Sequence, residues 1–396
     1  MNRTGLVVAN LDCEQEYARD PHRRRPPDRL PAPVRRMISS AGALMVVFAR
    51  DGDVLWTPEP IDRERVALAR GRDIGFVSGQ LDRQVDRRGR HYSKILSWAE
   101  TETIAALRPE PGESRRSDAV SSWPQLVWRV WPDPALARRG NDRRHGFAIA
   151  RELGSILPGS AILSSPEMLV RHLARRGHEY GHQGAWVLKA PFSAAGRQRV
   201  RRRGRRLDDR IRKRVVRLFH RCGELVFEPW VDRLVDFGCV GMVLGPDQSI
   251  LLPPHRLYCD AAGVFRGVGV GKPDHWPEQV IDAARAIGEC AGRVARYLGR
   301  DGYRGPFGID GFAYRDAHGK RRVHALCEIN ARLSFGHIAH ALAAHYPERP
   351  VTLRLGSGPV PRCEGAEETI VPLLLPGQSD DTSAWLEVAS RHPFER

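Results

Sequence analysis

Two acidic side chains set in apolar segments constrain the fold of this chain more than any other feature. Asp310 interrupts the apolar segment Phe307–Phe312, and Glu328 ends the apolar segment Val323–Glu328. Turn residues at Asp316–Gly319 separate the two segments, which predicts two adjacent, paired strands. Carboxylates on adjacent strands repel each other, so this arrangement is costly unless a cation lies between them.

The cation that these side chains favour is Mg²⁺. Asn330 follows Glu328 by two residues, and Asp, Glu and the Asn amide oxygen are hard ligands that suit Mg²⁺ better than zinc. Mg²⁺ keeps ligand positions for phosphate oxygens, so a nucleotide triphosphate is its natural companion. The guanidinium of Arg332 could donate two parallel, charge-assisted hydrogen bonds to a phosphate or a carboxylate. The alternative is that both carboxylates pair with local arginines at the edge of a sheet.

A lysine at the end of another apolar strand is the next candidate. Lys189 is one of only five lysines among 63 basic residues, and it ends the segment Trp186–Ala190. The small residues Ser193, Ala194, Ala195 and Gly196 follow. Such residues let backbone N–H groups close over phosphates, whereas the simpler interpretation of Lys189 is a strand end that reaches water.

The segment 225–232 predicts a strand that runs into a bend containing Pro229. Its backbone could offer N–H and C=O groups to the edge of an adenine, with Phe227 and Trp230 for packing. Taken alone, the same pattern describes many strand ends.

The 396 residues suffice for two or three domains. Strands and helices are predicted to alternate along most of the chain, with a linker at Pro109–Asp118. Strands are expected at Leu44–Ala49, Val54–Trp56, Ile74–Ser78, Leu126–Trp131, Ser160–Leu163, Trp186–Ala190, Leu225–Glu228, between Leu234 and Val268, and at Thr369–Leu375. Helices are expected at Asp62–Arg70, after Asn141 as N-cap, from Ser165, at Leu207–Arg221 and at Pro277–Gly299.

These pieces, in this order and together with Asn141–Arg144, resemble the ATP-grasp superfamily. The resemblance covers roughly residues 126–345, and its most specific part is Asp310 with Glu328-x-Asn330-x-Arg332. It implies an α+β fold in which two α+β subdomains clamp ATP, preceded here by a small α/β domain. The implied divisions are 1–120 for the preceding domain, 121–227 for the N-terminal subdomain and 228–396 for the C-terminal subdomain.

The resemblance also implies roles for individual residues. Metal ligands would be Asp310, Glu328 and Asn330. Nucleotide contacts would come from Arg143, Lys189, the loop Ser193, Ala194, Ala195 and Gly196, the hinge Glu228, Pro229, Trp230 and Val231, and Asp232 or Asp236 near the ribose. Lys189 and Arg332 would offset charge on the moving phosphoryl group, and Arg256 is a candidate for binding the substrate carboxylate.

The function implied is an ATP- and Mg²⁺-dependent ligase that joins a carboxylate, on a small molecule or a peptide, to an amine through an acyl phosphate. One alternative is an ATP-grasp phosphotransferase whose acceptor is not a carboxylate. Another is a non-catalytic polyanion-binding protein with a degenerate nucleotide site.

A basic segment supports that last alternative. Thirteen Arg or Lys residues lie between Arg197 and Arg221 against Asp208 and Asp209, so much of the formal net charge of +16 comes from here. The segment is either a solvated helix face, a funnel for an acidic substrate, or a surface for nucleic acid.

Other sequence features concern the cellular location of the protein and a possible histidine metal site. Seven single cysteines without a CxxC pair favour a reducing cytoplasm over a disulfide framework, and no apolar run predicts a membrane span. His337, His340 and His345 could suggest a metal site, but their spacing favours polar helix residues.

Overall fold

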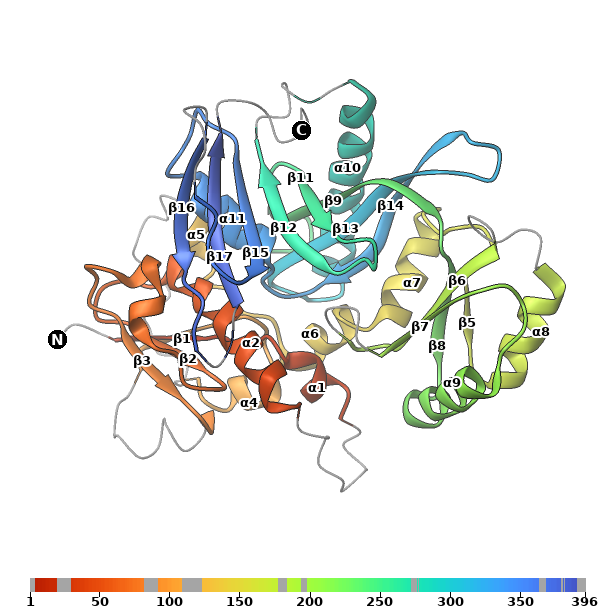
Figure 1. The fold of residues 1–396 in the computed structure, drawn as a ribbon, viewed down its shortest axis with the longest axis horizontal. Helices are drawn as coiled ribbons and strands as arrows, with labels where there is room; N and C mark the ends of the chain where they lie inside the picture. Colours follow the sequence, from red (N-terminus) through yellow and green to blue (C-terminus); the bar gives the residue numbers. More distant parts are fainter. Residues whose placement is uncertain are drawn as a thin grey trace.

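The computed structural model describes residues 4–19, 30–81, 92–108, 123–176, 184–193, 198–271, 276, 278–362, 368–378, 380 and 382–389. Within these residues the strands form three sheets, built from residues 5–97, 161–229 and 232–389. Figure 1 shows the second sheet, with α8 and α9, as a separate lobe at the right of the molecule. We propose these sheets as the cores of three domains and place the second boundary after Pro229, because residues 227 and 228 both lie within one strand.

The first sheet is parallel, in the order β3-β2-β1-β4. Its strands are β1 (Gly5–Val8), β2 (Val54–Thr57), β3 (Gly75–Ser78) and β4 (Lys94–Ser97). Around it lie α1 (Cys13–Tyr17), α2 (Ala32–Gly42), α4 (Glu102–Ala105) and the 3-10 helices η1 (Ala43–Phe48), η2 (Arg63–Arg65) and η3 (Ala67–Ala69). A small α/β domain was expected here, but β1 was not predicted.

The second sheet is antiparallel, in the order β5-β8-β6-β7. Its strands are β5 (Ala161–Leu163), β6 (Ala185–Lys189), β7 (Arg199–Arg203) and β8 (Leu225–Pro229). The helices α8 (Pro166–Arg176) and α9 (Asp209–Cys222) pack against it. Asp208 caps α9 by accepting from the Ile211 N–H, and Ile211, Val215 and Phe219 form the buried stripe expected of four-residue spacing.

The third sheet follows the order β14-β13-β9-β11-β12-β15-β17-β16, with β10 paired to β9. Its strands are β9 (Asp232–Val243), β10 (Ser249–Leu251), β11 (His255–Cys259), β12 (Phe265–Val270), β13 (Gly305–Arg315), β14 (Arg321–Asn330), β15 (Val351–Ser357), β16 (Glu368–Leu374) and β17 (Thr382–Ala389). The long helix α10 (Glu278–Arg300) packs on β9, β13 and β14, and α11 (Phe335–Ala343) packs on β9, β12 and β15. The predicted pairing of β13 with β14 is therefore confirmed.

Four local predictions were wrong. Leu44–Ala49 is the 3-10 helix η1 rather than a strand, and Asp62–Arg70 forms the two short 3-10 helices η2 and η3 rather than one α-helix. The segment 126–131 follows α5 (Trp123–Leu126) as turns and irregular chain rather than a strand. The N-cap of α7 (Arg143–Glu152) is Asp142, because Asn141 instead ends α6 (Pro134–Gly140). The predicted linker Pro109–Asp118 lies outside the described residues.

No helix among the described residues is both long enough and apolar enough to cross a membrane.

A buried histidine pair joins α11 to the third sheet. The Nε2 of His340 lies 3.3 Å from the Nδ1 of His255 on β11. Gly238 and Gly336 make room for the His255 ring, since a Cβ at either position would lie 2.4 or 2.6 Å from a ring atom. His337 accepts the Ser334 N–H at Nδ1 and so donates from Nε2 to the Gly241 carbonyl. These contacts make His337 and His340 polar core residues; among the described residues, no group of three or more His, Cys, Asp or Glu side chains is placed to hold a metal ion.

The buried histidines predict that the folded protein becomes less stable in acid. Burial lowers the pKa of His340 to about 4 and of His337 to about 3. Below about pH 6.5 the unfolded chain binds protons that these folded groups do not, so the free energy of unfolding should fall as the pH drops toward 4. Urea titrations between pH 7.5 and pH 4.5 would measure this slope. His340→Gln should flatten it, whereas the exposed His220→Gln should not; a pH-independent stability would contradict the prediction.

Candidate active site

The two predicted acidic residues lie directly opposite each other on β13 and β14. Asp310 and Glu328 are register partners, and Gly308 faces Asn330 two positions away. The Asn330 side-chain amide donates to the Asp310 carboxylate over 3.2 Å. A break in the strand register follows Asp310, between Asp310 and Phe312. The structure therefore brings the three predicted metal ligands together on one strand pair.

The chemistry of this group fits a hard cation. Burial, followed by the neighbouring charge of Glu328, raises the pKa of Asp310 to about 7. Such a shift marks a carboxylate whose negative charge has too little positive compensation nearby. Two carboxylates and an amide oxygen are the donors that Mg²⁺ prefers, so the residues present fit the ion that the fold implies.

A polar side chain that was predicted only as a helix cap holds these ligands in place. Asn141 donates from its amide to the Ala331 carbonyl over 3.1 Å and accepts the Ala331 N–H over 3.1 Å. Ala331 lies between Asn330 and Arg332. Gly140 permits this close approach, because a Cβ there would lie 2.5 Å from the Ala331 Cβ. Asn141 thus fixes the backbone that carries both neighbouring side chains.

Arg143, at the start of α7, connects Glu328 to the predicted phosphate loop. Its guanidinium donates to Glu328 over 2.6 Å, to the Ala190 carbonyl over 2.9 Å, and to the hydroxyl and carbonyl of Ser193 over 2.8 and 2.6 Å. The predicted loop residues Ala194, Ala195 and Gly196 lie outside the described residues. Arg143 therefore sets the first residue of that loop beside the acidic pair.

Lys189 forms a mostly buried ion pair with Glu228. The Lys189 Nζ lies 2.5 Å from a Glu228 oxygen, and the two side chains are 14% and 12% exposed. Burial opposes the charged ammonium, yet Cys327 and Glu228 together raise the pKa of Lys189 above its ordinary value. The Nζ also lies 3.9 Å from the Cys327 sulfur, next to Glu328. Lys189 is thus a charged cation beside the acidic pair rather than a strand end in water.

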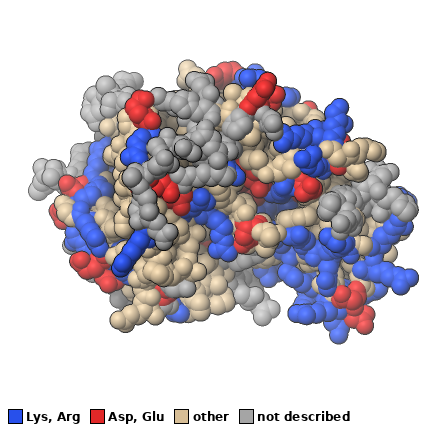
Figure 2. All heavy atoms as spheres, turned by 45° about the horizontal axis from the view of Figure 1, so that its top comes forward, with Lys and Arg blue, Asp and Glu red and all other residues tan. Residues whose placement is uncertain are grey.

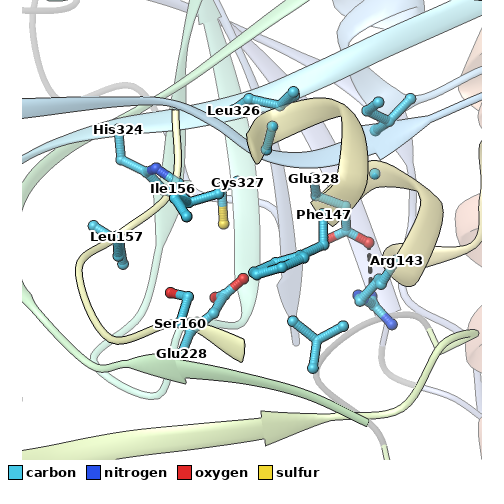
Figure 3. Close-up of a pocket in the computed structure, with 14 residues that line it drawn as sticks. Arg143, Phe147, Ile156, Leu157, Ser160, Glu228, His324, Leu326, Cys327 and Glu328 are labelled. Atoms are coloured by element: carbon cyan, nitrogen blue, oxygen red, sulfur yellow. Dashed lines mark hydrogen bonds and ion pairs between the residues drawn. The ribbon is translucent and has the colours of Figure 1, made fainter. Parts of the chain in front are cut away.

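A small cavity lies among these groups. Figure 3 shows Glu228 and Glu328 reaching it from β8 and β14, with Phe147 projecting from α7. Its open volume is about 20 Å³, enough for roughly one water molecule. Sequence reasoning missed Phe147, since one aromatic residue on an amphipathic helix carries no functional signal.

A larger cavity of about 670 Å³ lies beside the predicted hinge, between the second and third sheets. Trp230, Val231, Asp232 and Asp236 line it, together with the predicted carboxylate-binding Arg256. The backbone N–H of Trp230 donates to Ala185, and Asp236 pairs with Arg233 over 2.8 Å. Pro229 is buried at the end of β8. This cavity is large enough for part of a nucleotide or for a small acid.

Two further contacts join the second and third sheets at this cleft. Arg199 and Arg201 of β7 donate to the carbonyls of Ala262 and Ala261, in the turn between β11 and β12. The guanidinium of Arg201 also lies 4.0 Å from the centre of the Trp230 ring. The second sheet is therefore held to the third beside the cavity.

The predicted phosphate-binding Arg332 has a different partner from the one expected. Its guanidinium pairs with Glu14 of α1 over 3.0 Å, and its Nε, like Glu14 Oε2, is buried without a hydrogen-bond partner. The adjacent Leu333 N–H donates to Trp98 beyond β4. Arg332 thus faces the first domain, at the carboxyl end of the parallel sheet. Arg256, for its part, stacks over Tyr258 at 4.6 Å.

Comparisons with known proteins rest on structure alone. No family model and no curated protein matches the sequence. N5-carboxyaminoimidazole synthetase from Staphylococcus aureus, complexed with ADP, aligns over 98% of this chain and 94% of its own, with a TM-score of 0.54 and 10% identity. The biotin carboxylase domain of Hydrogenobacter thermophilus 2-oxoglutarate carboxylase, complexed with MgADP, ADP and bicarbonate, aligns over 98% and 86%, with a TM-score of 0.54 and 14% identity.

A third structure agrees with these two. Biotin carboxylase from Campylobacter jejuni, in a complex with a β,γ-ATP ligand, aligns over 98% of this chain and 87% of its own, with a TM-score of 0.56 and 10% identity. At identities this low, the structural alignments show the fold alone. The chain therefore has the ATP-grasp fold, as the pattern of Asp310 with Glu328-x-Asn330-x-Arg332 predicted.

Proposed function

We propose that this protein is an ATP- and Mg²⁺-dependent ligase that joins a carboxylate to an amine. One observation carries the proposal: Asp310, Glu328 and Asn330 converge on one strand pair, and Arg143 connects that pair to the loop at Ser193. Arg143 and Glu328 border a cavity that Glu228 of the second sheet also lines, which supports a site where a triphosphate would be enclosed between the two sheets. The solved structures that share the fold include complexes with ADP and MgADP, which supports a nucleotide here.

The nucleotide would lie between the second and third sheets. Lys189 and Arg143 would contact its phosphates, since both are cations beside the acidic pair. The hinge from Glu228 to Val231 would present backbone groups to the base, and Asp232 or Asp236 would bind the ribose from the larger cavity. Asp310, Glu328 and Asn330 would hold Mg²⁺, which neutralises phosphate charge when bound.

The reaction then has two steps. A substrate carboxylate oxygen attacks the γ-phosphorus of ATP, and ADP leaves. The amine nitrogen next attacks the carbonyl carbon, and phosphate leaves with one oxygen from the carboxylate. The contribution of the chain is to position the reactants, to offset charge through Lys189 and Arg143, and to exclude water that would hydrolyse the acyl phosphate. A reducing, ATP-containing cytoplasm would suit this chemistry.

The test is a screen of amino acids, small carboxylic acids and peptides for release of ADP and phosphate. An ¹⁸O-labelled carboxylate should transfer one labelled oxygen to the released phosphate. ADP release without that transfer would support phosphotransfer to another acceptor. Absence of ATP binding would support a degenerate nucleotide site and overturn the proposal.

The charge repulsion at Asp310 predicts a trade-off between stability and function. Because the folded state raises the pKa of Asp310 to about 7, the stability of the ligand-free fold falls as the pH rises from about 4 to about 7, and the full cost of the ionised carboxylate is present at pH 8. Asp310→Asn should therefore increase the free energy of unfolding at pH 8 by about 1–3 kcal/mol while removing Mg²⁺-dependent turnover. Urea denaturation without ligand measures the first effect. A destabilised variant would show that the hydrogen bond from Asn330 outweighs the cost of burial and the repulsion from Glu328.

A further inference from the structure

A strongly basic surface lies beside the cleft. We use the term α9–β7 basic surface for Arg201 and Arg202 of β7 with Arg210, Arg214 and Arg217 of α9. Together with Ile211 they line a hollow of about 410 Å³ between the strand and the helix. Lys and Arg side chains gather at the lower right of Figure 2, where Figure 1 places α9.

The surface has little negative charge of its own. Residues 198–222 carry twelve Arg or Lys against Asp208 and Asp209. Arg202 pairs with Asp208, at 39% and 59% exposure, and Arg214 donates to a backbone carbonyl, that of Arg199. Most of the positive charge is therefore uncompensated within the segment, so an anion from outside would be attracted strongly.

The hollow adjoins the larger cavity beside the hinge. Arg201 and Arg202 line both the hollow and the larger cavity beside the hinge. Arg201 is held between these two spaces by Trp230 and by the Ala261 carbonyl. An extended anionic chain seated on the surface would thus lie against guanidinium groups that also border the cavity lined by Arg256.

The geometry favours a polypeptide over a nucleic acid. Binding of single-stranded nucleic acid usually uses exposed aromatic rings on which bases stack. Phe219, the aromatic residue of α9, is buried, and the nearby Trp230 ring is covered by Arg201. By contrast, β7 is an edge strand of its sheet, and an edge strand can pair with an extended peptide.

We propose that the α9–β7 basic surface docks an acidic segment of a polypeptide, and that a carboxylate of that polypeptide is the one activated in the cleft. The proposal rests on the proposed ligase function and specifies its substrate class. Guanidinium groups would bind the side-chain carboxylates of Asp or Glu in charge-assisted pairs, while the reacting carboxylate continues into the cleft. The basic segment thereby becomes a substrate-docking surface rather than a solvated helix face.

The experiment uses the full chain and a fluorescently labelled poly-L-glutamate peptide. Fluorescence anisotropy without ATP should show binding that weakens steeply with added NaCl. The triple variant Arg210→Gln, Arg214→Gln, Arg217→Gln should bind the peptide about tenfold more weakly or worse. The matched control, Arg285→Gln, Arg293→Gln, Arg296→Gln, removes three exposed charges from α10 and should change the affinity by less than about twofold.

Separate readouts distinguish this inference from the ligase proposal. Peptide binding that depends on the α9 arginines supports the docking surface even when no carboxylate supports ATP turnover. Turnover with a small carboxylic acid, combined with equal peptide affinity in both triple variants, overturns docking and leaves the ligase intact. A single-stranded oligonucleotide of equal charge that binds more tightly than the peptide also overturns it. The docking proposal is likewise overturned if the α9 triple variant loses as much affinity for ATP as it loses for the peptide.

Discussion

Glu328→Gln should reduce ATP turnover by about a thousandfold or more. The substitution keeps the size of the side chain but removes the negative charge opposite Asp310, and with it one of the ligands that we propose for Mg²⁺. It also weakens the ion pair that positions Arg143. The fold should survive, because the Glu328 side chain is 29% exposed and Arg143 retains its bonds to Ala190 and Ser193. Coupled-enzyme detection of ADP and a thermal melt measure the two quantities.

Glu224→Gln is the matched control for that loss. Glu224 is 51% exposed and pairs with Arg144, away from the acidic pair. Its substitution should leave turnover within about twofold, as expected for an exposed ion pair. Turnover by Glu328→Gln at the wild-type rate would remove Glu328, and the metal assignment with it, from the catalytic machinery.

Lys189→Met should both destabilise the protein and weaken nucleotide binding. Met fills a similar volume but leaves the Glu228 carboxylate without its cation in a site where both side chains are largely buried. Removing one partner of such a pair costs about 3–5 kcal/mol of folding free energy. The loss of a phosphate contact should lower ATP affinity in addition. Denaturant titration and equilibrium binding of a fluorescent ATP analogue report the two effects separately.

The double variant Lys189→Met, Glu228→Gln separates stability from binding. Neutralising Glu228 removes the uncompensated buried charge, so most of the lost folding free energy should return. The ATP affinity should stay low, because the phosphate contact is still missing. If the double variant regained wild-type affinity, Lys189 would act only as the structural partner of Glu228.

Local sequence patterns predicted the strand pair that carries the acidic residues. Asp310 and Glu328 lie in apolar segments separated by a short turn, so the hairpin register is set by nearby residues. The same holds for α9, where Asp208 and the four-residue apolar spacing are both local. These elements could be predicted because their stabilising contacts lie within a few residues of one another.

The incorrect predictions have a physical cause in long-range packing. The apolar segment Leu44–Ala49 is buried almost throughout, so its periodicity cannot distinguish a strand from a helix; its packing against α2 and α11 settles the matter. The partners of Arg332 and His340 lie 318 and 85 residues away along the chain. The side chain of Asn141 likewise forms hydrogen bonds with the backbone of Ala331, which lies 190 residues away along the chain. A single sequence carries no local signal for such contacts.

The bonds from Arg199 and Arg201 to the turn between β11 and β12 have a consequence for ligand exchange. Each is a hydrogen bond near solvent and contributes about 0.5–1.5 kcal/mol. Breaking both would therefore require about 1–3 kcal/mol, which corresponds to an open population of roughly one molecule in six to about one in 160. ATP could then enter and ADP could leave through thermal opening of the two sheets, without unfolding of either one.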